Sequence, residues 1–397
     1  MMHWTAPTMF ALALLFASCA APPPPPPPPP AKLGDPTLAG AVHDMLVDLR
    51  QQVGAQAQLP RTAVVDTFLD GRSAQQTTAS ERAQQEFVQA LPGVLPQVQV
   101  LRFDEDGARQ SRWVVTGTLS AANDAGAADG AAVPGRWRLV VALADRPSGL
   151  VVAQAVARVD DAALQAAPTR FYADSPALVR DRTVDGFLRT TETPAGQPAD
   201  AVYLEQLPTG ALLAGALEAY NAKRWDEAHR YYEAAAQRRD GHQMRTFNGL
   251  YLASLQLGRQ SEAEAAFGHI TALGLATNNL AVKLLFRPGS TDFWPDPQIS
   301  GHYPMWIRQI ARSARSADTC LDIVGHTSRT GSVAYNDRLS LARADSMRER
   351  LDNEAPGLAR RIATHGVGWR ENLVGSGTDD ARDAVDRRVE FRVVPCR

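Results

Sequence analysis

The fold is decided by Leu321-Asp-Ile-Val-Gly-His-Thr-Ser-Arg-Thr-Gly331, which is followed by Tyr335-Asn-Asp-Arg-Leu-Ser-Leu-Ala-Arg-Ala344. The short apolar run predicts a strand, the glycine after it a turn, and the second stretch the opening of a helix. A strand, a turn and a helix in this order gather the hydrogen-bonding side chains that follow the strand at the mouth of one potential site. This stretch is therefore the candidate binding site of the chain.

The elements on either side of this stretch predict a small α+β domain with a mixed sheet. They are a strand at Leu280–Phe286, a helix at Trp306–Arg315, a strand at Leu321–Val324, a helix from Asn336 to about Leu351, and strands at Ala363–Val367 and Val389–Val394. The β-α-β-α-β-β order favours helices packed on one face of the sheet. Leu339, Met347 and Leu351 are expected on the buried side of the second helix, and Glu371 to Val385 is a long polar loop.

Together with Asp386-Arg-Arg-Val-Glu-Phe391, these motifs make residues 278–397 resemble the OmpA-like C-terminal domain. That family grips the peptide stem of peptidoglycan through meso-diaminopimelate, which presents one carboxylate and one ammonium. The resemblance implies that Thr327, Asn336, Leu339 and Arg343 line the pocket, and that Arg387 matches the first arginine of the family's Asn-Arg-Arg triplet. The fork of an arginine suits a carboxylate far better than lysine does.

Ser328 departs from the family pattern, because an aspartate usually follows the Gly-His-Thr. A neutral hydrogen bond contributes about 0.5–1.5 kcal/mol, against about 1.5–3 kcal/mol for a bond with a charged group. The loss is of order 1–2 kcal/mol, so we expect the pocket to bind its ligand roughly five- to thirtyfold more weakly than one with aspartate. Asp386 stands where the family has asparagine; it either lies near the mouth and partly replaces the missing charge, or merely pairs with Arg387 or Arg388. His326 is expected to be structural.

The whole chain has the composition of a multidomain globular protein. Its 397 residues suggest two to four domains, and the hydrophobic and charged fractions are 45% and 21%. The formal net charge of −2 argues against a nucleic-acid binder. We find no nucleophile elbow, paired-histidine zinc motif or phosphate loop, so neither an enzyme nor a cofactor is predicted. Gly375-Ser-Gly-Thr-Asp-Asp380 is better interpreted as variable loop than as a phosphate or calcium loop.

Residues 1–19 resemble a bacterial lipoprotein signal peptide, in which Cys19 becomes the lipidated N-terminal residue. A plain secretory signal with a chance cysteine is the alternative. Ala20, rather than aspartate, follows the cysteine and favours the outer membrane. The linker at residues 20–35 contains the unbroken tract Pro22–Pro30, expected to be a polyproline II spacer of roughly 28 Å.

Two further cysteines follow in the chain. Cys320 begins one predicted strand and Cys396 follows the end of another. If these strands are antiparallel neighbours, the two thiols lie at the same end and form a disulfide, as suits the oxidising periplasm. Two buried free thiols are the alternative.

Residues 36–200 predict a second α+β domain. A helix is expected at 36–55, a strand at Arg61–Leu69, a helix at Ser80–Leu91, and antiparallel strands at Val98–Phe103, Trp113–Leu119, Trp137–Ala144 and Val151–Val159. The element order, with Val114-Val-Thr-Gly-Thr-Leu119 and Leu143-Ala-Asp-Arg-Pro-Ser-Gly-Leu-Val-Val152, weakly resembles the N-terminal domain of CsgG-like outer-membrane lipoproteins. Ala121 to Pro134 is expected to be a loop.

Residues 209–277 contain an internal repeat. Arg224-Trp-Asp-Glu-Ala228 with Tyr232 aligns with Arg259-Gln-Ser-Glu-Ala263 and Phe267 at a period of 35 residues. A small residue followed four positions later by an aromatic is similar to a tetratricopeptide helix pair, whose concave faces generally bind protein partners. An ordinary helical hairpin that serves as a spacer is the alternative.

These features predict an outer-membrane lipoprotein that binds peptidoglycan and recruits an unknown protein through its repeats. The alternative is a cell-envelope assembly or secretion-machine component whose OmpA-like domain has lost peptidoglycan binding and mediates protein contacts instead. Ser328 favours the second prediction; Asn336, Leu339, Arg343 and Arg387 favour the first.

Overall fold

The computed structural model describes residues 1, 37–54, 61–123, 133–287, 289–317, 319–374, 377 and 385–396. The predicted lipid site Cys19, the rest of the signal segment after Met1, the polyproline linker and most of the 375–380 loop lie outside these residues. The chain divides into two units, Met1–Lys32 and Leu33–Arg397, and the account below concerns the second. Within the described part, no helix has the length and apolar character needed to span a bilayer.

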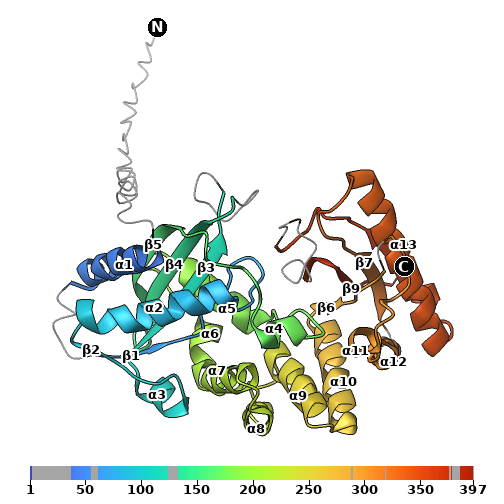
Figure 1. Cartoon of the computed structure of the whole chain (residues 1–397), viewed down its shortest axis with the longest axis horizontal. Coiled ribbons are helices and arrows are strands. Elements are labelled where there is room, and N and C mark those ends of the chain that lie inside the picture. Colours follow the sequence, from blue (N-terminus) through green and yellow to red (C-terminus); the bar gives the residue numbers. More distant parts are fainter. Residues whose placement is uncertain are drawn as a thin grey trace. The chain divides into compact units, whose positions relative to one another are not determined.

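The N-terminal region builds one five-stranded sheet with helices. Its elements are α1 (Leu38–Val53), β1 (Arg61–Val65), α2 (Thr78–Val94), β2 (Val98–Val100), α3 (Glu105–Gln110), β3 (Trp113–Ala121), β4 (Arg136–Asp145) and β5 (Leu150–Asp160). The strands lie in the order β2-β1-β3-β4-β5. Helices α1 and α2 lie side by side (Figure 1) and share an apolar core with the sheet that includes the fully buried Phe87 and Trp113.

The prediction that the later strands are all antiparallel was wrong. Strands β2 and β3 both pair with β1 in parallel, and only the β3-β4 and β4-β5 pairs are antiparallel. The reason is that α2 and α3 return the chain to the starting edge between these strands, as parallel pairing requires. The second predicted strand is also shorter, because Asp104 accepts a hydrogen bond from Gly107 N (2.8 Å) and so begins α3.

Helices make up the middle of the chain, including three that were not predicted. These are α4 (Arg170–Asp174), α5 (Arg182–Glu192) and α6 (Ala201–Glu205), followed by α7 (Leu207–Asn221), α8 (Trp225–Ala236), α9 (Met244–Gln256) and α10 (Gln260–Ala276). The 35-residue period marks equivalent positions, since Arg224 and Arg259 each directly precede the second helix of a pair. Gly249 allows the repeat aromatic Tyr232 to pack on α9, because a Cβ there would lie 2.2 Å from its ring.

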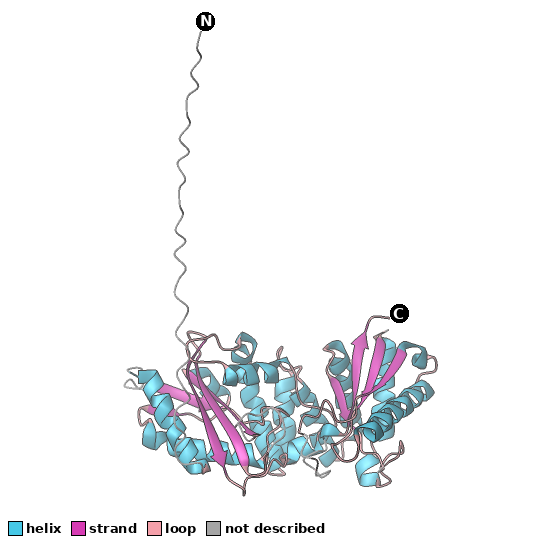
Figure 2. Ribbon diagram, turned by 90° about the horizontal axis from the view of Figure 1, so that it is seen from above, coloured by secondary structure: helices cyan, strands magenta, loops and turns pink. Residues whose placement is uncertain are grey.

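The C-terminal region builds a second sheet, separate from the first in Figure 2. Its elements are β6 (Leu280–Lys283), α11 (Pro297–Ser300), α12 (Tyr303–Ser316), β7 (Cys320–Gly325), α13 (Val333–Glu354), β8 (Ile362–Gly366) and β9 (Arg388–Val394). The order is β6-β9-β7-β8, with β7 and β8 parallel and the other pairs antiparallel, so the predicted mixed sheet is confirmed. Strand β6 ends before the predicted Phe286, which instead forms an isolated bridge with Phe293.

Two glycines let α13 pack directly on this sheet. A Cβ at Gly325 would lie 2.1 Å from Ser340 O, and one at Gly366 would lie 2.4 Å from Leu341 N. Ser340 is fully buried at this crossing, where its hydroxyl accepts a hydrogen bond from Gly368 N (3.0 Å). The backbone approach of helix and sheet is therefore set by the absence of side chains at these two strand positions.

An upstream segment completes the edge of the C-terminal sheet. Ala177 forms an antiparallel bridge with Val282, Leu178 N donates to Ala281 O (2.8 Å), and Lys283 N donates to Pro176 O (2.8 Å). The ammonium of Lys283 donates to the carbonyls of Tyr172 (2.8 Å) and Ala173 (3.0 Å), and burial lowers the pKa of this lysine to about 8. Residues 176–178 thus act as an extra strand of the sheet, taken from a segment that precedes the helical repeats.

We predict that Leu178→Asp loosens this junction. Leu178 is 8% exposed and packs with Ala281 and Val385. Replacing it with a charge removes its apolar burial, so the free energy of unfolding should fall by about 2–4 kcal/mol. Urea denaturation measures the loss, and proteolysis should begin near residues 176–181. Val156→Asp is the matched control, because Val156 is 51% exposed and its change should leave the denaturation midpoint unmoved.

The two cysteines form the predicted disulfide. Cys320 and Cys396 are bonded and lie 76 residues apart, and Cys320 is paired with Val394 across the antiparallel β7-β9 ladder. The bond ties the last strand to its neighbour close to the end of the chain. It therefore restricts the unfolded chain much more than the folded one.

Replacing both cysteines with serine should lower the free energy of unfolding by about 2–4 kcal/mol. The double variant avoids a free thiol, and unfolding of the native protein with and without reductant supplies the comparison. Equal stability of the oxidised and reduced proteins would contradict the prediction.

Candidate functional site

The predicted pocket residues lie after the end of β7, along the first half of α13 and just before β9. Thr327 and Ser328 directly follow β7, while Asn336 and Arg343 lie on the face of α13 turned to the sheet. The juxtaposition of the strand ends follows from the register, since Gly325 pairs with Val389 and His326 N donates to Arg388 O (3.1 Å). The register therefore brings the end of β7 beside the start of β9.

The four side chains at this place are more buried than a free surface pocket would suggest. Thr327, Ser328, Asn336 and Arg343 are 2%, 7%, 2% and 6% exposed. Leu339 was predicted on the buried side of the helix but is only half-buried, because its position lies beside the stripe formed by Asn336, Ser340 and Arg343. Arg387 is also half-buried.

Asn336 shapes the turn that leads into α13. Its Nδ2 donates to Thr330 O (2.9 Å) and Ser332 O (3.1 Å). Gly331 adopts a φ of 100° in this turn, and a Cβ there would lie 3.3 Å from Asn336 Nδ2. The amide of Asn336 thus holds the loop that carries Ser328.

Arg343 contacts the loop that follows β6. Its Nε donates to Ser290 O (3.2 Å), its Nη2 donates to Arg287 O (3.3 Å), and its guanidinium lies 4.7 Å from the centre of the Phe286 ring. These partners are more than 50 residues away in the sequence, which offers no signal for them. Arg343 therefore joins this loop to α13 as well as standing at the predicted pocket.

Asp386 is buried inside the domain, which does not favour the interpretation that it supplies a charge at the mouth. Its side chain is fully buried, and Oδ1 accepts hydrogen bonds from Leu373 N (2.6 Å) and Val374 N (3.1 Å). A carboxylate that accepts two backbone N–H groups is well suited to order a loop. Asp386 thus ties down the start of the long polar loop before β9.

Comparison with known proteins now identifies the domain, because residues 285–386 match the OmpA family. The C-terminal domain is an OmpA-family domain. The match begins after the helical repeats, so the tetratricopeptide and CsgG-like resemblances of the upstream segments stay predictions.

Individual relatives each match a limited share of the chain. Outer membrane protein Omp38 of Acinetobacter baumannii is 43% identical over 67 residues, which is 17% of this chain and 18% of Omp38. The chain thus matches less than a fifth of that relative's length. Two solved structures are similar: the peptidoglycan-associated lipoprotein from Burkholderia pseudomallei (24% identity, TM-score 0.24, 29% of this chain and 89% of that chain) and the cell wall anchor of the T6SS from Pseudomonas aeruginosa (23% identity, TM-score 0.23, 29% and 78%).

A buried ion-pair network lies beside the OmpA-family motif. Glu390 Oε1 contacts Arg388 Nη2 (2.6 Å) and His326 Nε2 (3.4 Å), and Glu390 Oε2 contacts Arg392 Nη2 (2.6 Å). Burial opposes the ionisation of Glu390, yet His326 and the two arginines hold its pKa well below the usual range. Burial lowers the pKa of His326, against the opposing effect of Glu390.

The same network offers an apparent metal site, since ligand atoms of His326, Glu371 and Glu390 lie within 4.8 Å of one another. Arg392 Nη2 already contacts Glu371 Oε2 (2.8 Å), and Arg388 and Arg392 contact both oxygens of Glu390. A divalent cation would have to displace two guanidiniums and bear their repulsion. We therefore interpret the cluster as structural, in line with the predicted role of His326.

Acidification should destabilise the protein through this pair. Unfolded histidine takes up a proton near pH 6.5, whereas folded His326 resists it, so stability falls as the pH drops below that value. Glu390 adds to the loss below its ordinary pKa of 4.5, as the unfolded carboxylate is protonated first.

Denaturation midpoints measured between about pH 7.5 and 5.5 should therefore decline less in His326→Gln than in the native protein. His365→Gln is the matched control, since His365 lies on the neighbouring strand with a side chain that is 54% exposed. If His365→Gln reduces the pH dependence of the denaturation midpoint as much as His326→Gln does, His326 is not the residue responsible.

Proposed function

We propose that this protein is a lipoprotein of the cell envelope whose OmpA-family domain binds the peptide stem of peptidoglycan without a covalent bond. Lipid on Cys19 would hold one end in the outer membrane, and the C-terminal pocket would hold the wall. The observation that carries the proposal is the family match over residues 285–386, a range that includes Thr327, Asn336 and Arg343.

The chemistry of Arg343 supports a carboxylate ligand. Its bonds to Ser290 O and Arg287 O are 3.2 and 3.3 Å long, whereas charge-assisted bonds to carboxylates measure about 2.7–2.9 Å. A guanidinium has five N–H donors in one plane, so one arginine can serve several acceptors, carboxylates among them. We infer that the diaminopimelate carboxylate approaches Arg343 from the mouth beside Ser328.

Ser328 makes the proposed pocket weak toward the ligand's ammonium, since a hydroxyl lacks the charge of the usual aspartate. Asp386 does not stand in for that charge, because its carboxylate is buried against the backbone of Leu373 and Val374. Weak binding is adequate in a tethered protein. A lipid anchor and a linker raise the effective concentration of the domain at the wall.

A second function is favoured by the same substitution. Ser328 and the backbone contacts of Arg343 also suit a domain that has lost peptidoglycan binding and mediates protein contacts in an envelope assembly or secretion machine. In this case the helical repeats and the C-terminal domain would both serve protein partners. The two functions differ in whether purified wall is bound.

The deciding experiment is co-sedimentation of residues 33–397 with purified sacculi of the diaminopimelate type. This length is needed because residues 176–178 complete the C-terminal sheet. We expect weak binding that Arg343→Ala abolishes and that Ser328→Asp strengthens about five- to thirtyfold. Arg338→Ala is the matched control, since this exposed arginine lies two residues after Asn336 on the opposite face of α13.

Thermal unfolding of each variant separates lost binding from lost folding, and Arg343→Lys keeps the charge while it removes the fork. If the native protein does not sediment but Ser328→Asp does, the pocket is a relic and the second function is favoured. If Arg343→Ala folds and still binds as the native protein does, the proposed site is wrong.

A further inference from the structure

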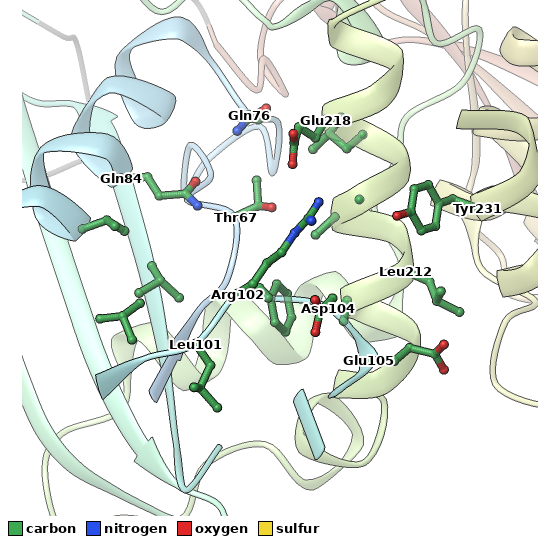
Figure 3. A pocket seen from close by; sticks show the side chains of 18 of the residues that line it. Thr67, Gln76, Gln84, Leu101, Arg102, Asp104, Glu105, Leu212, Glu218 and Tyr231 are labelled. Carbon is green, nitrogen blue, oxygen red and sulfur yellow. The ribbon is translucent and has the colours of Figure 1, made fainter. Parts of the chain in front are cut away.

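A large cavity lies outside the OmpA-family domain, between the N-terminal sheet and the first helical pair. Its volume is about 1000 Å³, at the upper end of the range for ligand pockets. The walls come from the loop after β1, helix α2, the segment that follows β2, the start of α3, helix α7 and Tyr231 of α8. Figure 3 shows the side chains of these elements turned toward a common space.

The position of the cavity in the sheet favours a ligand. It lies beyond the carboxyl ends of β1 and β2, as the lining residues Val65 and Val100 are the last residues of these parallel strands. From β1 the chain moves outward to β2 and then returns past β1 to β3. At such a reversal in a parallel sheet, adjoining loops leave a crevice in which ligands generally bind.

Among the side-chain amides that line the cavity, Gln76 and Gln84 have their oxygens already engaged. Gln84 Oε1 accepts from Phe68 N (3.1 Å), and Gln76 Oε1 accepts from Thr169 Oγ1 (3.2 Å) and Asn221 Nδ2 (3.4 Å). An amide has one acceptor and one donor group, so the NH₂ groups remain for a ligand. Figure 3 shows both amides beside Thr67 at the end of the space.

The charges that line the cavity are mostly paired within the protein. Arg109 contacts Asp106 (2.7 Å) and Glu105 (3.8 Å), Glu218 contacts Arg224 (3.4 Å), and Asp104 caps α3. Two lining charges differ from these.

Arg102 and Glu81 have no ion pair among the residues that the structure describes. The exposed side chain of Arg102 extends into the space between Thr67 and Glu218 (Figure 3). Glu81 is half-buried, and burial raises its pKa. The cavity therefore presents one uncommitted cation and one uncommitted acid.

We propose that this cavity binds a peptide segment with a free carboxylate, which pairs with Arg102 while its backbone carbonyls accept hydrogen bonds from Gln76 and Gln84. Apolar side chains of the peptide would pack on Leu101, Leu212 and Tyr231, which line the same space. Five carboxylates in the lining oppose a polyanion such as a nucleic acid or a phosphorylated ligand. Amide donors, apolar walls and a single available guanidinium together match a peptide.

This site shares no residue with the wall-binding pocket, and the proposal does not depend on peptidoglycan binding. It does give a chemical class to the protein partner that the helical repeats suggest. Helix α7, the first helix of the first pair, forms one wall, and helix α2 with the segments that follow β1 and β2 supplies others. Neither half of the site would be complete alone.

The test presents residues 33–397, immobilised, with an equimolar pool of N-acetylated random hexapeptides. One pool carries free C-terminal carboxylates, and a second pool of the same composition carries C-terminal amides. Mass spectrometry of the retained peptides should show enrichment of the free acids only. Arg102→Ala should lower the affinity for the retained free-acid peptides roughly ten- to hundredfold, as expected for the loss of one charge-assisted contact.

Arg82→Ala is the matched control, because Arg82 is an exposed arginine of α2 that does not line the cavity, and it should leave the enrichment unchanged. Ala214→Trp should fill the space from α7 and remove binding without lowering the unfolding temperature. No enrichment, equal retention of acids and amides, or enrichment that survives Arg102→Ala in a folded protein would each overturn the proposal.

Discussion

The packing of α13 directly onto β7 and β8 is the constraint on which the C-terminal domain depends. Gly325 and Gly366 remove the side chains that would otherwise separate helix and sheet, and Ser340 occupies the crossing. Because this contact sets the height and rotation of α13, it also sets where Asn336 and Arg343 stand relative to the end of β7. The pocket inherits its geometry from backbone contact, and a change of one methyl group here would move it.

The C-terminal domain is also joined to the rest of the chain by more than its covalent link. Residues 176–178 extend its sheet at β6, Lys283 binds the carbonyls at the end of α4, and Trp306 Nε1 donates to Tyr251 OH (2.8 Å) across the boundary with the repeats. Each of these contacts buries polar backbone or aromatic surface that an isolated domain would expose. A load on a wall-bound domain would thus be carried by three junctions rather than by one linker.

The local elements of the C-terminal domain were predictable, because glycine turns and apolar runs mark them in the sequence. Strand pairing could be anticipated only for β7 and β9, because β7 begins at Cys320 and β9 ends near Cys396, and a disulfide between them requires the two strands to be neighbours. The parallel β2-β1-β3 arrangement was missed, since parallel pairing depends on α2 and α3 returning the chain to the same edge of the sheet. Asp386 and Arg343 were only partly understood, because their backbone partners come from loops that have no side-chain signature.

By itself the sequence indicated the OmpA-like resemblance of the C-terminal domain and the 35-residue period of the helical repeats, whereas the disulfide depended on a strand pairing that the structure supplied. The resemblance and the period are properties of spacing, and spacing along the chain is local information. The tertiary structure decided that an upstream segment completes the C-terminal sheet, that Asp386 is buried, and that Arg102 faces a cavity beside α7. These are properties of long-range packing, in which contacts are made by whichever surfaces the folded elements bring together.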